Sequence, residues 1–375
     1  SLSTTRTFDD SMTKLFKDFM PEEGVGGETG IGDIFGGRQD VGIAGFSVNQ
    51  VVFTWGQVGA AIRAAKLGFG VADQQLRRFQ QAVEKDVTTA FYDVLAAREL
   101  ATIARQDLEQ RQRHLDETIK RQSAGTATDY DVLAARVAVE NGRPAVIRAE
   151  NGVRLAREQL RFLLAEPGEV DAAGALAATI EPPPPYEQVL ASALENRPEV
   201  AELSGTKGIY GELVTIAKAA NKPRVDFSAS WGQRRLGLKT ISARGTTWNA
   251  GLVATIPLFD GWRTKGAVAQ AQSDLVRLNF DELKLRDGIR LEVRNALNAV
   301  REASEIVAAL GGTVAQAEKL LFLAEKGFEL GVKTRLEVQD AELNLSSARA
   351  NLARAQRDYN VARVNLEWVA GTLGQ

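Results

Sequence analysis

The stretch IRLEVRNALNAVREASEIVAALGGTVAQAEKLLFLAEKGF, residues 289–328, decides the fold of this chain. Apolar residues recur in it in alternating steps of four and three, at Ile289, Val293, Ala296, Val300, Ala303, Val307, Leu310, Val314, Ala317, Leu321, Ala324 and Phe328. This spacing keeps one stripe of a helix turned toward a neighbouring helix, as in a coiled coil. We therefore predict a helical rod over residues 267–336. At about 1.5 Å per residue, such a rod is roughly 100 Å long.

The same rod occurs a second time, 206 positions earlier in the chain. That offset relates Phe53 to Phe259 and Gly125 to Gly331 without a gap, which predicts a tandem duplication of a helical hairpin. The predicted parts are a first repeat (1–165), a proline-rich linker with a leading helix (166–222) and a second repeat (223–375). Because the first repeat has no counterpart of the helix predicted at 186–220, we expect that a leading helix and any export signal are absent from this sequence.

Composition excludes several classes of function. The net charge of −2 over 375 residues offers no basic field for nucleic acid. There is no cysteine and one histidine, His114, which we predict to be a plain surface residue facing away from the seam. The sequence contains no run of 18 or more apolar residues, so no transmembrane helix is predicted. We find no nucleophile–base pair and no metal cluster, so neither an enzyme nor a cofactor is expected.

The β signals are two pairs of short segments. Residues 225–231 and 247–256 alternate between apolar and mostly polar positions and give the clearest β signal, while 41–53 and 1–8 are weaker strands. Residues 9–40 predict a long glycine-rich loop in which no phosphate-binding frame fits. Trp231 and Trp248 fall on the apolar faces and suit an interfacial aromatic girdle, although a half-buried sheet in a soluble sandwich has the same period. Four strands are too few to close a barrel in lipid, so several copies would have to pool them.

Four motifs carry a resemblance to a known family: PLFDGWR at 257–263, NRPE at 196–199, GTATDYDV at 125–132 and GVKTRLEV at 331–338. In their order and in the register of 206 residues, they resemble the outer-membrane efflux protein family, the TolC-like channel-tunnels, over nearly the whole chain. The resemblance implies an α+β membrane protein of a Gram-negative bacterium. It implies a homotrimer whose twelve-stranded outer-membrane β-barrel, four strands per protomer, continues into a long α-helical coiled-coil barrel in the periplasm. Such channels export drugs, metals or proteins with a periplasmic adaptor (membrane fusion protein) and an inner-membrane transporter, and do no chemistry.

The resemblance also implies where the working residues lie. Glu337 and Asp340 match an acidic ring at the periplasmic constriction, and Lys333 matches a basic latch residue with Asp131 as its carboxylate partner. Phe328 stands where an aromatic hydroxyl bonds that carboxylate in the family, and phenylalanine has no hydroxyl. The alternative is that these are ordinary solvated charges at helix starts.

The turns with Gly125 and Thr126 and with Gly331 and Val332 resemble the tips that meet the adaptor, although glycine also serves a turn simply by its positive φ. A rival interpretation of the whole chain is a soluble coiled-coil periplasmic scaffold or adaptor. The pattern leaves open the exported substrate, the class of transporter, the state of the gate and whether a lipid-anchored cysteine precedes Ser1.

Overall fold

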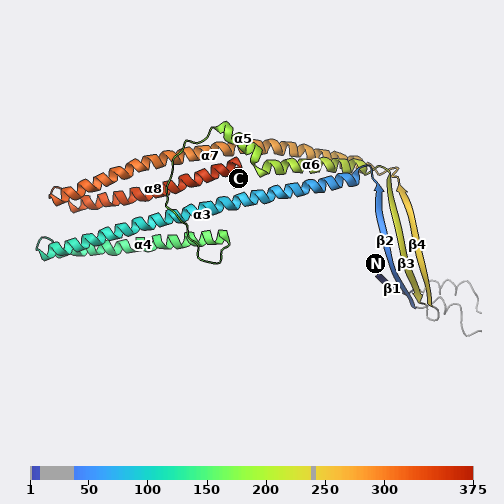
Figure 1. Ribbon diagram of the computed structural model, residues 1–375, viewed down its shortest axis with the longest axis horizontal. Helices are drawn as coiled ribbons and strands as arrows, with labels where there is room; N and C mark the ends of the chain where they lie inside the picture. The colour runs from blue at the N-terminus through green and yellow to red at the C-terminus, as the bar shows by residue number, and fades with distance from the viewer. Residues whose placement is uncertain (1, 9–37, 238–241, 375) are drawn as a thin grey trace, which may run out of the picture. The chain divides into compact units, whose positions relative to one another are not determined.

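The computed structural model describes residues 2–8, 38–237 and 242–374. Their elements are β1 (Leu2–Phe8), β2 (Arg38–Phe53), α3 (Gln57–Ser123), α4 (Asp129–Leu164), α5 (Tyr186–Asn196), α6 (Pro198–Ala219), β3 (Arg224–Gly237), β4 (Ser242–Thr255), α7 (Arg263–Glu329) and α8 (Arg335–Ala370) (Figure 1). The predicted glycine-rich loop lies outside the described residues, apart from positions 38–40, which begin β2. The chain divides into two compact units, Ser1–Lys66 with Gly208–Val276 and Leu67–Lys207 with Arg277–Gln375.

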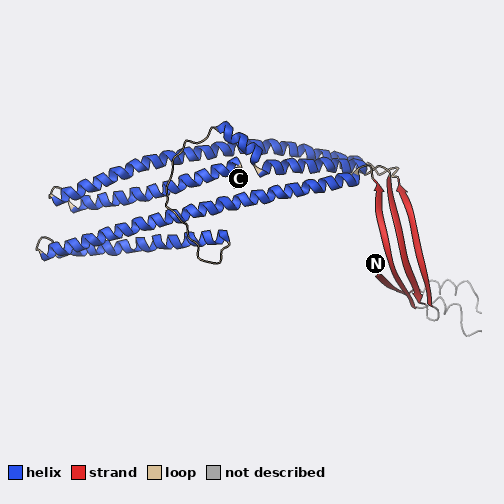
Figure 2. Ribbon diagram, viewed as in Figure 1, coloured by secondary structure: helices blue, strands red, loops and turns tan. Residues whose placement is uncertain are grey.

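The first unit contains one antiparallel sheet in the order β1-β2-β3-β4 (Figure 2). Phe46, Trp231 and Trp248 are directly paired across β2, β3 and β4 and form one aromatic row. All three are exposed. The residues that follow on this face are also mostly apolar: Val48, Ala229, Ala250, Phe227 and Leu252. The sheet therefore has one exposed apolar face.

The opposite face of the same strands is polar. It carries Ser47, Asn49, Ser228, Ser230 and Asn249, and the Ser230 hydroxyl donates to Asn249 Oδ1 at 2.9 Å. Near its end β2 has a bulge between Val51 and Phe53, so that Phe53 pairs with Val225 on the apolar face. One extra residue inverts the side-chain alternation, and the apolar face thereby extends to the end of the strand.

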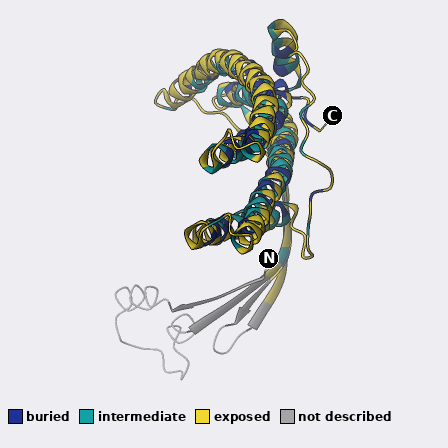
Figure 3. Cartoon of the chain, turned by 90° about the vertical axis from the view of Figure 1, so that its left-hand side faces the viewer, coloured by how far each residue is buried: buried dark blue, intermediate teal, exposed yellow. Residues whose placement is uncertain are grey.

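Two helical hairpins of matching dimensions lie largely in the second unit, and their long helices begin in the first. The helices α3 and α7 each have 67 residues, and α4 and α8 each have 36. The predicted seam is buried against the return helix, as where Ala317 packs with Leu345 and Ala348. In the first hairpin Leu115 packs with Val132, Ala135 and Val139. Figure 3 shows this burial along the helices, with exposed residues on their outer sides.

Two helices have unusual composition. The helix α4 is continuous through Pro144. The helix α7 contains an 18-residue window with a mean hydropathy of 1.4, which by length and composition alone suits a membrane span. Only 11% of that window is buried inside the chain. The seam residues of α7 pack on α8, so we assign α7 to the helical hairpin rather than to a membrane span.

The linker and the NRPE motif join the two repeats. Residues 198–219 form α6 directly after α5, because Pro198 starts a helix well and cannot continue one. Arg197, whose side chain is 5% exposed, forms ion pairs with Glu199 and Glu292. The fully buried Tyr359 holds the linker: its hydroxyl donates to Thr179 O and accepts from Glu181 N, both at 3.1 Å.

Candidate functional site at the hairpin tips

Each helical hairpin closes through the same turn, built around a glycine. Gly125 and Gly331 both have a φ of 74°, a left-handed conformation that glycine adopts at little cost. The next amide, of Thr126 or Val332, donates back to a carbonyl of the preceding helix at 2.9 Å in both turns. This is the hydrogen-bond pattern of a Schellman motif. All four predicted tip residues are exposed at the ends of the hairpins.

A capping box follows each turn and begins the return helix. The Thr128 backbone N–H donates to Asp131 Oδ2 at 2.8 Å, and the Asp131 N–H donates to the Thr128 hydroxyl at 3.2 Å. Thr334 and Glu337 repeat this exchange at 2.7 and 3.3 Å. Each acid satisfies amide groups that the first turn of a helix leaves free. Asp131 and Glu337 therefore occupy equivalent positions, 206 residues apart.

The charge on Glu337 is strongly stabilised. Lys333 Nζ donates to Glu337 Oε1 at 2.5 Å. This bond and those from Thr334 lower the pKa of Glu337 to about 2. The hydrogen bonds from Thr128 lower the pKa of Asp131 in the same way. Both carboxylates are therefore fully ionised at neutral pH.

The predicted latch is arranged differently within one protomer. Among the described residues, Lys333 bonds Glu337, and no hydrogen bond or ion pair joins it to Asp131. Asp340 is exposed one turn after Glu337 on the same helix. Phe328 lies between two cations, with its ring centroid 4.9 Å from the Arg121 guanidinium and 5.8 Å from that of Arg335.

His114 was predicted to be a plain surface residue, and that prediction is wrong. Its side chain is 15% exposed, and its Nδ1 has no hydrogen-bond partner among the described residues. Burial, together with the nearby positive charges of Arg335 and Arg121, lowers the pKa of His114 to about 4. The nearest carboxylate oxygen, Glu117 Oε2, lies 3.9 Å from Nδ1. The seam pattern did not reveal this position because it faces the other hairpin, across a polar surface without periodicity.

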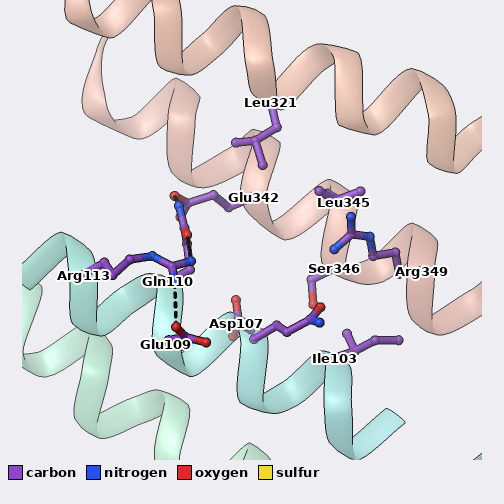
Figure 4. Close-up of a pocket in the computed structure, with 11 residues that line it drawn as sticks. Ile103, Asp107, Glu109, Gln110, Arg113, Leu321, Glu342, Leu345, Ser346 and Arg349 are labelled. Atoms are coloured by element: carbon purple, nitrogen blue, oxygen red, sulfur yellow. Dashed lines mark hydrogen bonds and ion pairs between the residues drawn. The ribbon is translucent and has the colours of Figure 1, made fainter. Parts of the chain in front are cut away.

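Further polar residues that sequence reasoning missed connect α3 with α8. Gln110 Nε2 donates to Glu342 Oε1 at 3.2 Å, and Figure 4 shows these two side chains pointing toward one another. They line a cavity of about 350 Å³, and Glu342 also lines a second cavity of about 230 Å³ with His114 and Arg335. Burial and the charge of Glu342 raise the pKa of Glu325. The hairpins thus meet near their tips through polar and charged groups rather than through a hydrophobic core.

These groups are suited to holding two hairpins together or releasing them. Within residues 2–8, 38–237 and 242–374, no three histidine, aspartate or glutamate side chains form a group that could hold a metal ion. The cations Arg121 and Arg335 pack on an aromatic ring, and the acids cap helices. Such contacts break and reform at modest cost in free energy, unlike a packed core.

Comparison with known proteins identifies the family. The profile of the outer membrane efflux protein family matches residues 20–166 and 189–372. The chain belongs to this family. Its members are transport proteins of the outer membrane rather than enzymes, so this efflux protein is an outer-membrane protein and the rival interpretation as a soluble scaffold is wrong.

Two relatives of this efflux protein show the extent of the sequence similarity. Outer membrane protein TolC of Escherichia coli (strain K12) is 24% identical over 372 residues, which cover 95% of this chain and 75% of TolC. Alkaline protease secretion protein AprF of Pseudomonas aeruginosa is 25% identical over 311 residues, which cover 81% of this chain and 64% of AprF.

Solved structures show the same fold. A membrane protein from Pseudomonas aeruginosa matches with a TM-score of 0.75 at 20% identity, covering 99% of this chain and 83% of that protein. The open state of the Neisseria gonorrhoeae MtrE outer membrane channel matches with a TM-score of 0.74 at 18% identity, covering 99% of this chain and 80% of MtrE. The efflux protein therefore has the fold of these channels, which confirms the resemblance stated from its motifs.

Proposed function

We propose that three copies of this chain pool their sheets into a twelve-stranded barrel in the outer membrane. The observation that carries the proposal is the sheet, which has one exposed apolar face, one polar face and two edges, β1 and β4. Lipid offers no hydrogen-bond partner to an open edge, so the edges must pair with those of other copies. A barrel with an apolar exterior and a polar interior satisfies both faces at once.

In this proposal the paired hairpins of the three copies continue the barrel as a helical tunnel across the periplasm. The two repeats, 1–165 and 223–375, each supply one hairpin, and the segment 166–222 joins them. The tunnel conducts substrates passively, as the outer part of a tripartite efflux pump or a type I secretion system. Its partners are an inner-membrane transporter and a periplasmic adaptor that contacts the tip turns at Gly125, Thr126, Gly331 and Val332.

We further propose that the hairpin tips form the gate. Three copies of Glu337 and Asp340 would place carboxylates around one narrow opening, which favours cations. Lys333 neutralises part of this ring through its bond to Glu337, and Phe328 joins the two hairpins of a protomer through Arg121. For Lys333 to form a latch with Asp131, it must first release Glu337. The Asp131 that it then contacts belongs either to the same protomer or to a neighbouring one.

Two measurements test the proposal. Electron microscopy of the purified protein should show threefold particles with a long tapered tube, and planar-bilayer recordings should show cation-selective channels. The double variant Glu337→Gln with Asp340→Asn should shift the reversal potential toward zero in a salt gradient. The matched pair Glu302→Gln with Glu305→Gln, which lies on α7 away from the tip turn, should leave that potential unchanged.

The latch needs its own recording. Lys333→Ala combined with Asp131→Ala should raise the resting leak, and an unchanged conductance would remove the latch. A water-soluble monomer without channel activity would contradict the proposed function as a whole.

A further inference from the structure

Both junctions between a strand and a long helix hold a tryptophan in an unusual backbone conformation. Trp55 has a φ of 50° and Trp262 a φ of 65°, in the left-handed region that residues with a side chain seldom adopt. Each stands beside a glycine that is also left-handed, Gly56 or Gly261. Such strain persists where the surroundings or a function require it. Because it recurs at two separate junctions, the placement of the two indole rings is the feature to explain.

Each of these tryptophans has a lysine over its ring. Lys265 Nζ lies 5.1 Å from the Trp262 ring centroid, and Lys222 Nζ lies 5.9 Å from that of Trp55. The cation–π attraction favours both positions of the ammonium groups. The rings are exposed, so that each pair presents an apolar plane with a positive charge beside it.

The pair at the second junction borders a groove with an excess of positive charge. The groove has a volume of about 820 Å³ and is lined by Lys218, Lys222 and Lys265. Its one acidic residue, Asp260, already accepts the Thr264 N–H at 2.9 Å as a cap of α7. The lining of the groove therefore has three ammonium groups and one carboxylate, which is already hydrogen-bonded to the backbone. This charge balance suits an anion.

The walls of the groove are apolar and unusually exposed. Leu258 is 94% exposed, Phe259 79% and Trp262 69%. Large apolar side chains that gather on a surface in this way mark a contact with a partner or a membrane. An occupant that fits both features has a negative head and apolar chains.

The position of the groove along the sheet identifies that occupant. Thr255, where β4 ends, lies seven positions after Trp248 in the aromatic row. At roughly 3.3 Å per residue this is about 23 Å along the strand, or roughly 17 Å of height at a tilt of about 40°, and the junction residues 256–262 follow beyond Thr255. Membrane barrels carry an apolar band about 25 Å tall between two aromatic girdles. The row of Phe46, Trp231 and Trp248 thus lies at one interface, and the junction tryptophans lie at the other.

We propose that the strand–helix junctions bind an anionic phospholipid of the leaflet on the helix side of the membrane. The lysines Lys218, Lys222 and Lys265 hold its phosphate, while Trp55, Trp262, Phe259 and Leu258 contact its acyl chains and glycerol. This inference rests on the proposed insertion of the sheet in the outer membrane. It explains why two strained tryptophans are each placed beneath a lysine.

The test compares lipid binding by the detergent-purified protein and by the variant Lys218→Gln/Lys222→Gln/Lys265→Gln. Short-chain phosphatidylglycerol, short-chain phosphatidylcholine and inorganic phosphate are titrated separately, and bound lipid is counted by native mass spectrometry. A control variant, Lys120→Gln/Lys284→Gln/Lys319→Gln, makes the same charge change at exposed lysines elsewhere. Circular dichroism and the oligomeric mass establish that all three proteins keep their fold.

The wild type and the control should bind phosphatidylglycerol in preference to phosphatidylcholine and to inorganic phosphate. Each lysine near a membrane surface strengthens binding of anionic lipid by roughly fivefold, so the triple variant should bind phosphatidylglycerol at least about tenfold more weakly. Equal binding of the two lipids by the wild type, or an unchanged affinity in the triple variant, would overturn the inference.

Two further outcomes are distinguishable. If the variant loses the oligomer while its phosphatidylglycerol binding is unchanged, a second copy of the chain covers the groove and the inference is wrong. If the lipid result is as expected but bilayers show no channels, the proposed conduction fails and the lipid site stands.

Discussion

Acid should loosen the contact between the two hairpins near their tips, through His114. In the folded chain burial and the charges of Arg335 and Arg121 lower the pKa of His114 to about 4, from an ordinary value near 6.5. A group with a lowered pKa binds its proton more tightly when the contact is open. The contribution to stability is therefore complete above about pH 6.5, falls as the pH drops below that value, and levels off near pH 4.

The magnitude follows from the size of the shift. A difference of about 2.5 pH units corresponds to roughly 3 kcal/mol between the closed and open contact. His114 is 15% exposed, so solvent screening reduces this figure only in part. The other charged groups around the site are Asp107, Arg111 and Glu117 on α3 with Asp340 and Glu342 on α8. Glu325 opposes the effect, because its raised pKa favours protonation in the folded chain as the pH falls.

Hydrogen exchange measured by mass spectrometry tests this prediction between pH 7 and pH 4.5. After correction for the intrinsic pH dependence of exchange, peptides from α3 around position 114 and from the start of α8 should lose protection in the wild type. His114→Gln keeps a polar side chain without the titration, and its corrected protection should not fall, because only the opposing titration of Glu325 is left. Glu337, with a pKa of about 2, remains ionised throughout this range. Equal acid sensitivity in the wild type and His114→Gln would refute the assignment.

Three other substitutions have definite expectations. Tyr359→Phe leaves the two backbone partners of the buried hydroxyl unsatisfied, which should cost about 2 kcal/mol and increase hydrogen exchange in the linker; unchanged exchange there contradicts the role. Gly371→Ala places a Cβ 2.9 Å from Arg197 N at a φ of 73°. It should destabilise the chain by about 2 kcal/mol, read as a lower thermal midpoint, whereas Gly211→Ala, which meets open space inside α6, should not lower it. Lys333→Ala removes the partner of Glu337, so the channel should become more cation-selective in bilayers, and an unchanged reversal potential would exclude Glu337 from the pore.

The hairpins and their turns could be predicted closely because their signals are local. The three-four spacing of Ile289, Val293 and Ala296 is buried as expected, since a helical stripe depends only on the order of residues along the chain. Thr128 begins α4 as its cap, a feature that the sequence can indicate because a capping box needs only residues within one turn. The strands were located as well, although β3 extends to Gly237, past the point where the alternation weakens.

The site was less accessible to sequence reasoning. The acids Asp131 and Glu337 were assigned to a latch and a ring, and in one chain both cap helices. Phe328 has no hydroxyl to bond the latch carboxylate, and in the structure arginines from two helices pack on its ring instead. No spacing in the sequence indicates such a pairing, since Arg121 and Arg335 lie more than two hundred residues apart.

By itself, the sequence determined the rods, their duplication, the alternating strands and the caps, because each depends on residues that are neighbours along one helix or strand. Only the tertiary structure decided which polar groups meet between the hairpins, how far His114 is buried and that a bulge turns Phe53 onto the apolar face. It also decided the left-handed setting of Trp55 and Trp262 and the lysines above them. The physical reason is that contacts between distant segments depend on packing geometry, for which polar surfaces leave no periodic pattern in the chain.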